Sequence, residues 1–163
     1  ELHGAGSRMN QPENIEAQLR EQGFYVSTTV GWSMFPMLRN RRDRVVVLPV
    51  GQERLRKYDL PLYRRPDGKY ILHRIIGVRE GEYIIRGDNT YVKEHVPDGW
   101  ILGYVSEFYR GERHVTASGR GYRCYAVLWN RIYPLRWLFF QGRRTVAWVW
   151  RRMRGKPKQQ SGS

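Results

Sequence analysis

The chain contains a single cysteine, Cys124, which excludes an intramolecular disulfide. Its four histidines are widely separated, and no Cys/His cluster has the spacing of a zinc site. His3, His95 and His114 are therefore interpreted as surface or loop residues. The sequence predicts a domain without a metal or cofactor, stabilised by its apolar core.

Long apolar runs are also missing, since none approaches the ~20 residues that a membrane-spanning helix needs. The N-terminus is polar and has no signal-peptide pattern. These absences predict a peripheral membrane or cytoplasmic protein. Residues 1–8 resemble an expression-vector remnant before a natural start at Met9, and they are left out of the fold prediction.

Acidic residues are scarce in the last third of the chain. Residues 1–109 carry 16 Lys/Arg and 14 Asp/Glu, a net charge of +2. Residues 110–163 carry 13 Lys/Arg and one acid, Glu112, a net charge of +12. A basic segment of this kind predicts an anionic partner, either phospholipid head groups or nucleic acid.

Residues 9–23 are predicted to hold one short helix, Pro12 to Gln22, with proline in its first turn and Gly23 after its end. Residues 24–110 are rich in aromatic and β-branched runs divided by turn residues, which predicts a mainly β domain. The expected strands run from Phe24 to Val30, Val45 to Leu48, Lys57 to Tyr63, Tyr70 to Val78, Tyr83 to Arg86 and Trp100 to Tyr109. Pro66-Asp67-Gly68 predicts a hairpin turn. Pro61 predicts an edge or bulged strand.

The composition changes after the β domain. Residues 111–121 are predicted to be a flexible linker because they include Ala117-Ser118-Gly119-Arg120-Gly121. Residues 122–154 interleave arginines with aromatic residues, which favours a basic amphipathic helical region on an anionic membrane surface. Two alternatives remain: these aromatics pack on the β domain, or the segment binds nucleic acid. Residues 155–163 are predicted to be a disordered tail.

The stretch Gly31-Trp32-Ser33-Met34-Phe35-Pro36 is a candidate nucleophile turn. Gly31 gives the backbone freedom before Ser33, and Pro36 fixes the chain direction after it. A serine hydroxyl needs a neighbouring base to become a good nucleophile. The candidate base is His73, in a β run where Ile71, His73 and Ile75 are expected to share an apolar face. Such a setting favours the neutral imidazole that a general base requires.

Three motifs follow one another in the chain: Ser-Met-x-Pro, a His-Arg pair in a strand, and Gly87-Asp88-Asn89. In this order they resemble the motifs of the signal peptidase I family and its LexA-type relatives. The resemblance covers about Thr28 to Arg110. It implies a signal peptidase/LexA-like β domain and a serine endopeptidase that cuts an extended segment with small residues before the cleaved bond. His73 stands where bacterial enzymes have a lysine, so the arrangement resembles the endoplasmic reticulum-type enzymes.

The resemblance leaves the third catalytic residue open between Asp88 and Glu94, and a Ser–His dyad remains if neither reaches His73. It implies that Met34, Phe35, Pro36 and Ile71 contact the substrate, with core packing as the alternative. The Ser33 N–H is the expected oxyanion donor. A different class of function is also open: a non-catalytic or autoprocessing LexA-like module that binds membrane or nucleic acid through its basic end.

Overall fold

The structure is a computed structural model that describes residues 12–138. The chain divides into two compact units, residues 1–130 and 131–163, and the elements below belong to the first, apart from the last residue of α2. They are α1 (Pro12–Gln22), β1 (Tyr25–Thr28), β2 (Asp43–Pro49), β3 (Pro61–Arg64), β4 (Tyr70–Leu72), β5 (Arg74–Arg79), β6 (Glu82–Arg86), β7 (Glu94–Pro97), the 3-10 turn η1 (Asp98–Trp100), β8 (Ile101–Arg110), β9 (Arg113–Thr116) and α2 (Arg120–Arg131).

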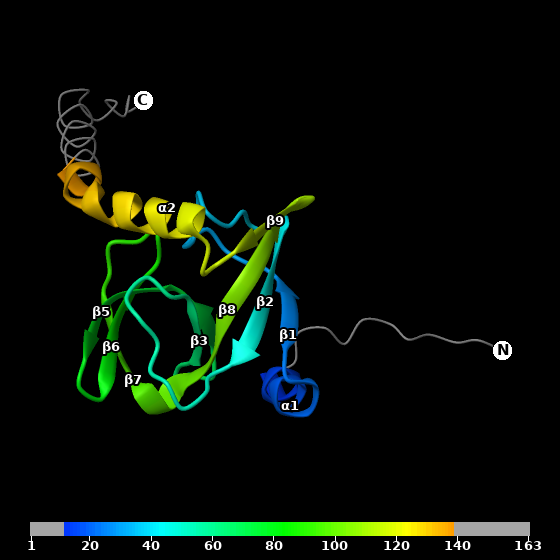
Figure 1. The fold of residues 1–163 in the computed structure, drawn as a ribbon. Helices are drawn as coiled ribbons and strands as arrows, with labels where there is room; N and C mark the ends of the chain where they lie inside the picture. Colours follow the sequence, from blue (N-terminus) through cyan, green and yellow to red (C-terminus); the bar gives the residue numbers. More distant parts are fainter. Residues whose placement is uncertain (1–11, 139–163) are drawn as a thin grey trace, which may run out of the picture. The chain divides into compact units, whose positions relative to one another are not determined.

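The strands form two antiparallel sheets, so the predicted mainly β fold with a short N-terminal helix is confirmed (Figure 1). The larger sheet has the order β1-β2-β8-β3-β4, and β9 pairs with β8. The smaller sheet has the order β5-β6-β7. The long strand β8 pairs with both β2 and β3, and it therefore joins the two halves of the larger sheet.

Apolar side chains form two buried clusters. In β2, Val45 and Val47 alternate with more exposed neighbours, as expected for a strand with one core face. They pack with Leu38, Leu60 and other residues in the first cluster. Ile15 and Leu19 of α1 join the same cluster, so the N-terminal helix is docked through one apolar stripe. The second cluster lies under the smaller sheet and includes Ile75 and Ile85.

The predicted hairpin turn is confirmed, and so is the bulge alternative for the strand that contains Pro61. Pro66, Asp67 and Gly68 connect β3 to β4, with a hydrogen bond of 2.9 Å from Gly68 N–H to the Arg65 carbonyl and Gly68 at φ +80°. Pro61 begins β3, which pairs with β8 on one side and β4 on the other. It is therefore not in an edge strand, but the pairing with β8 does carry the expected register irregularity, between Leu62 and Tyr63.

Several boundaries differ from the sequence prediction. The 111–121 linker is wrong over Arg113–Thr116, which form β9 against β8. Trp100 to Tyr109 is therefore not the final strand. The expected strand Tyr70 to Val78 is interrupted at His73, because β4 belongs to the larger sheet and β5 to the smaller one. His73 thus lies at the point where the chain changes sheets.

The start of the 122–154 region also needs correction. Helix α2 begins at Arg120, before the predicted boundary, and buries Tyr122 and Ala126 against the β domain. Packing of its aromatics on this domain was the alternative interpretation, and it holds for α2. The rest of the amphipathic prediction beyond Leu138, the tail 155–163, the remnant 1–8 and the start at Met9 lie outside the described residues. Within residues 12–138, no helix has both the length and the hydropathy of a bilayer span.

Candidate active site

The loop between β1 and β2 carries Ser33. Thr29 joins the two ends of this loop by backbone hydrogen bonds. Its N–H donates to the Asp43 carbonyl at 2.9 Å, and its carbonyl accepts from Arg41 N–H at 2.7 Å. Gly31 has a φ of +103°, a backbone conformation that residues with a side chain rarely adopt. Its N–H donates to Asn40 Oδ1 at 2.9 Å. Backbone hydrogen bonds and one glycine therefore define the turn that presents Ser33.

A buried carboxylate supports the same loop. Asp43 is 0 % exposed and accepts hydrogen bonds from Arg39 N–H at 2.7 Å and from the Arg39 guanidinium at 2.8 Å. Burial alone would raise the pKa of Asp43, but the hydrogen bonds and charge of Arg39 bring it below its ordinary value. The Arg39–Asp43 pair therefore fixes the base of the loop.

The Gly87-Asp88-Asn89 turn lies directly against Ser33. Asn89 N–H donates to the Ser33 carbonyl at 2.7 Å, and Asn89 Nδ2 donates to the Trp32 carbonyl at 3.2 Å. A Cβ at Gly87 would come within 2.7 Å of the Ser33 carbonyl oxygen, so only glycine permits this approach. The sequence placed this turn in the site, and its observed contact is with the backbone of Ser33.

His73 meets a carboxylate, and that carboxylate belongs to Glu94. Glu94 begins β7, and its Oε1 lies 3.3 Å from His73 Nδ1. This arrangement favours the tautomer with the proton on Nδ1, which leaves Nε2 as a proton acceptor. Of the two carboxylates left open by the sequence, Glu94 is the one beside His73.

Two further residues hold Glu94 and were not predicted as site residues. Tyr63 OH donates to Glu94 Oε2 at 3.1 Å, and Arg65 Nε donates to the same oxygen at 2.9 Å. Tyr63 is 0 % exposed and also lies 3.5 Å from His73 Nδ1. Tyr63 lies in β3, and Arg65 directly follows that strand. The two residues meet Glu94 only in the folded chain, so their spacing in the sequence gave no signal for this contact.

The surroundings of His73 change its basicity. Burial lowers the pKa of His73 below its ordinary value, and the Arg65 guanidinium acts in the same direction, against the opposing charge of Glu94. His73 is therefore neutral at pH 7, as a general base must be. Burial also raises the pKa of Tyr63, so its hydroxyl stays protonated and remains a donor to Glu94.

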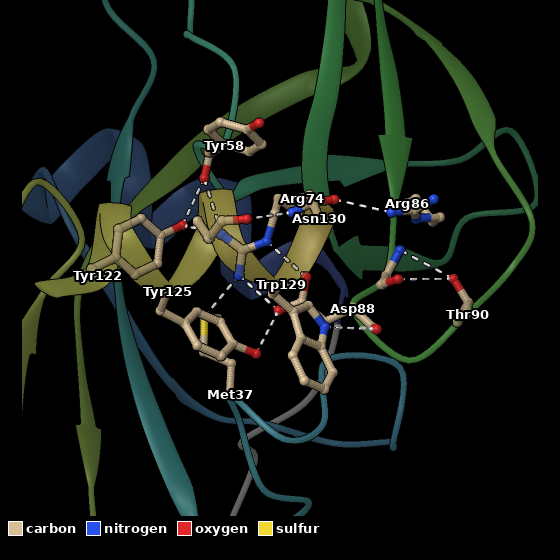
Figure 2. A network of polar contacts seen from close by, with 12 residues as sticks. Met37, Tyr58, Arg74, Arg86, Asp88, Thr90, Tyr122, Tyr125, Trp129 and Asn130 are labelled. Atoms are coloured by element: carbon tan, nitrogen blue, oxygen red, sulfur yellow. Dashed lines mark hydrogen bonds and ion pairs between the residues drawn. The ribbon is translucent and has the colours of Figure 1, made fainter. Parts of the chain in front are cut away.

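Asp88 does not face His73 but pairs with Arg74. Arg74 Nε and one terminal nitrogen donate to the two Asp88 oxygens at 2.7 Å each, and both side chains are buried (Figure 2). Burial alone would lower the pKa of Arg74, but the hydrogen bonds and charge of Asp88 raise it above its ordinary value. Asp88 is a structural anion whose partner, Arg74, lies next to His73 in the chain.

Replacing Arg74 by methionine is expected to destabilise the fold by about 3–5 kcal/mol, because it leaves the Asp88 carboxylate buried without its cation. The matched control is Arg79→Met, which breaks the exposed pair with Glu82 at 3.5 Å and should cost below about 1 kcal/mol. Urea unfolding of both variants measures the difference. Equal small losses in the two variants would contradict the structural role given to Arg74.

Ser33 and His73 line the same cavity, which has a volume of about 300 Å³. Its other walls come from β1, β2, β3, β4, α1 and the nucleophile loop. Most of the lining side chains are apolar or aromatic: Ile15, Tyr25, Val30, Met34, Leu38, Val45, Val47, Leu62, Tyr70, Ile71 and Leu72. An apolar cavity that contains Ser33 and a neutral histidine can bind an uncharged segment and exclude water from these two side chains.

The four predicted substrate-binding residues divide into two pairs. Met34 and Ile71 line the cavity. Phe35 and Pro36 do not line it, and Phe35 packs against Trp32 with ring centroids 5.9 Å apart. Phe35 is 41 % exposed, so it lies on the outer side of the loop. The cavity is built more from β1, β2 and β4 than the sequence indicated.

In the part of the chain that the structure describes, no group of three or more His, Cys, Asp or Glu side chains could hold a metal ion. The polar contacts at the site come from protein side chains and backbone. Neither a family model nor a curated protein matches this chain.

Proposed function

We propose that the protein is a serine endopeptidase of the signal peptidase I type, with Ser33 as nucleophile, His73 as general base and Glu94 as the carboxylate that orients His73. The observation that carries the proposal is the position of His73. One of its ring nitrogens lies 3.3 Å from Glu94, and the residue lines the cavity that also holds Ser33. The order of the sequence motifs supports the same assignment.

In the proposed reaction, Ser33 Oγ attacks the peptide carbonyl carbon while its proton passes to His73 Nε2. The imidazolium formed is stabilised by Glu94, and it then gives its proton to the leaving amine as the C–N bond breaks. The acyl group stays on Ser33 as an ester. Water attacks this ester while His73 takes its proton, and His73 then returns that proton to Ser33 Oγ as the acyl C–O bond breaks, which releases the acid and the free serine.

The tetrahedral intermediate carries a negative oxygen that needs a donor. The Ser33 N–H is the proposed donor, because the turn that contains it is fixed from both sides. Asn89 N–H donates to the Ser33 carbonyl, and the backbone hydrogen bonds of Thr29 join the two ends of the loop. Gly31 offers no side-chain hydroxyl, so the proposed oxyanion site depends on backbone donors.

The proposed substrate is an extended, uncharged peptide segment. Residues of β1 and β4 both line the cavity. These strands are the two ends of the larger sheet, and within the described residues β1 pairs only with β2 and β4 only with β3. Their outer backbone groups can therefore pair with an added strand, while its side chains enter the apolar cavity.

A peptide library analysed by mass spectrometry tests this function. Wild-type protein should cut peptides within uncharged segments and yield new carboxyl and amino ends, whereas Ser33→Ala should yield none. Ser27→Ala is the matched control, because Ser27 lines the same cavity and its hydroxyl donates to the neighbouring Thr28 carbonyl. The proposal fails if Ser33→Ala cuts as wild type does.

The pH dependence provides an independent prediction. Since protonated His73 cannot act as base and its pKa lies below the ordinary 6.5, kcat/KM should be constant near pH 7 and fall only at a more acidic pH. Initial rates from pH 4 to 8 on one peptide measure this acid limb. A limb centred above pH 6.5 would contradict the environment assigned to His73.

A further inference from the structure

Helix α2 turns one face toward the β domain next to the Asp88 turn. Tyr122, Tyr125 and Trp129 are spaced three and four positions apart and lie on that face (Figure 2). Tyr122 is buried, and the rings of Tyr125 and Trp129 stack with centroids 5.7 Å apart. Leu128, on another face of the same helix, is 63 % exposed. The helix therefore has one contact face.

Each of these three aromatic residues donates a hydrogen bond to the β domain. Tyr122 OH donates to the Tyr58 carbonyl at 2.6 Å and accepts from Arg74 at 2.7 Å. Tyr125 OH donates to Asp88 Oδ2 at 3.4 Å. Trp129 Nε1 donates to the Asp88 backbone carbonyl at 3.1 Å. Asp88 is thus held by α2 through both its side chain and its main chain (Figure 2).

The next residue after Asp88 binds the nucleophile turn. Asn89 N–H donates to the Ser33 carbonyl at 2.7 Å, and its side chain donates to the Trp32 carbonyl. The peptide plane between Asp88 and Asn89 therefore carries a hydrogen bond at each end, one from Trp129 and one to Ser33. Because that plane is rigid, a change in the first contact moves the second.

We propose that helix α2 is a positioning element of the catalytic site, with Trp129 and Tyr125 fixing the Asp88-Asn89 peptide that fixes Ser33. The inference rests on the proposed peptidase function. Neither residue lines the cavity: Trp129 bonds to this peptide directly, and Tyr125 bonds to the side chain of the same Asp88. Misplacement of a nucleophile by about 1 Å can lower the rate about 10²-fold. Helix α2 would in this way set the reactivity of a serine almost one hundred positions earlier.

Trp129→Phe in the full chain tests the proposal, because it keeps an aromatic ring and removes the Nε1–H donor. We expect kcat, and the rate at which a small reactive probe labels Ser33, to fall about tenfold with KM within about twofold. The acid limb of the pH profile should not move, because the surroundings of His73 are unchanged. Leu128→Ala on the exposed face is the control and should keep wild-type values.

Tyr125→Phe is the second variant and should lower the same two rates in the same direction. All rates are measured per folded molecule, at a temperature below the unfolding transition of each variant. Wild-type values of kcat and of the labelling rate in both folded variants would overturn the positioning role. An increase in KM without a fall in kcat would overturn it as well. These outcomes differ from failure of the proposed function, in which the wild type itself neither cuts peptide nor takes the label.

Discussion

Alanine in place of Ser33 or of His73 is expected to lower kcat by about 10⁴–10⁶-fold, because each removes a member of a set that acts as one unit. Without Ser33 no acyl-enzyme can form, and without His73 the serine hydroxyl keeps its proton. The double variant should be no slower than either single variant. This non-additivity separates a catalytic pair from two residues that contribute independently to folding or to substrate binding.

Matched controls are present in the chain. Ser27→Ala removes another hydroxyl from the same cavity, and His95→Ala removes an exposed imidazole that lies 3.0 Å from Glu82. Both should keep kcat within about threefold of wild type, as surface substitutions away from a reacting group do. Losses at Ser33 and His73 that simply multiply in the double variant would contradict the proposed catalytic pair.

Glutamine in place of Glu94 is expected to lower kcat by about 10²–10⁴-fold while leaving the side-chain shape unchanged. The amide cannot stabilise an imidazolium, and its NH₂ group can favour the wrong histidine tautomer. The Glu94 charge also raises the pKa of His73 against the effect of burial. Its removal should therefore move the acid limb of the pH profile to a still lower pH. Steady-state kinetics between pH 4 and 8 measure both effects.

Glu82→Gln is the control for this substitution, because Glu82 pairs with the exposed His95 in the same chemical arrangement. It should change neither kcat nor the acid limb. Asp88→Asn gives the contrast with the other candidate carboxylate: it should destabilise the fold, because Asp88 pairs with buried Arg74, and it should lower the acid limb less than Glu94→Gln does, because the Asp88 charge raises the pKa of His73 less than Glu94 does. An acid limb that moves with Asp88 and not with Glu94 would reverse the assignment made here.

The candidate nucleophile and base could be found from the sequence because they lie in ordered motifs with distinctive neighbours. Gly31 and Pro36 mark the Ser33 turn, and the His-Arg pair lies in a β-rich stretch. The choice between Asp88 and Glu94 could not be made in this way. It depends on the chain leaving the larger sheet at His73 and on β7 pairing with β6, and both are tertiary facts.

The supporting charges were harder to predict, because a charged residue in a sequence is ordinarily assigned to the surface. Arg74 and Asp43 are each 0 % exposed, and each is compensated by a partner of opposite charge. Alternation along one expected strand placed Arg74 opposite His73. The break between β4 and β5 instead buries both residues, in different surroundings.

The C-terminal region shows how composition alone misassigns a helix. Arginine and aromatic residues after Gly121 fit a membrane-surface helix as well as they fit a docked one. The phenol and indole donors of Tyr122, Tyr125 and Trp129 decide the matter for α2, because they find acceptors on the β domain. No sequence pattern records the positions of those acceptors.

Covalent labelling of the pure protein with reactive serine probes, read by intact mass and peptide mapping, tests whether Ser33 is an activated nucleophile. Several probe chemistries should be compared on wild type, Ser33→Ala and His73→Ala. An activated Ser33 predicts one added label on the peptide containing Ser33, absent in Ser33→Ala and strongly slowed in His73→Ala. A folded wild-type protein that takes no label with any probe, or takes the label equally well without His73, would contradict the account.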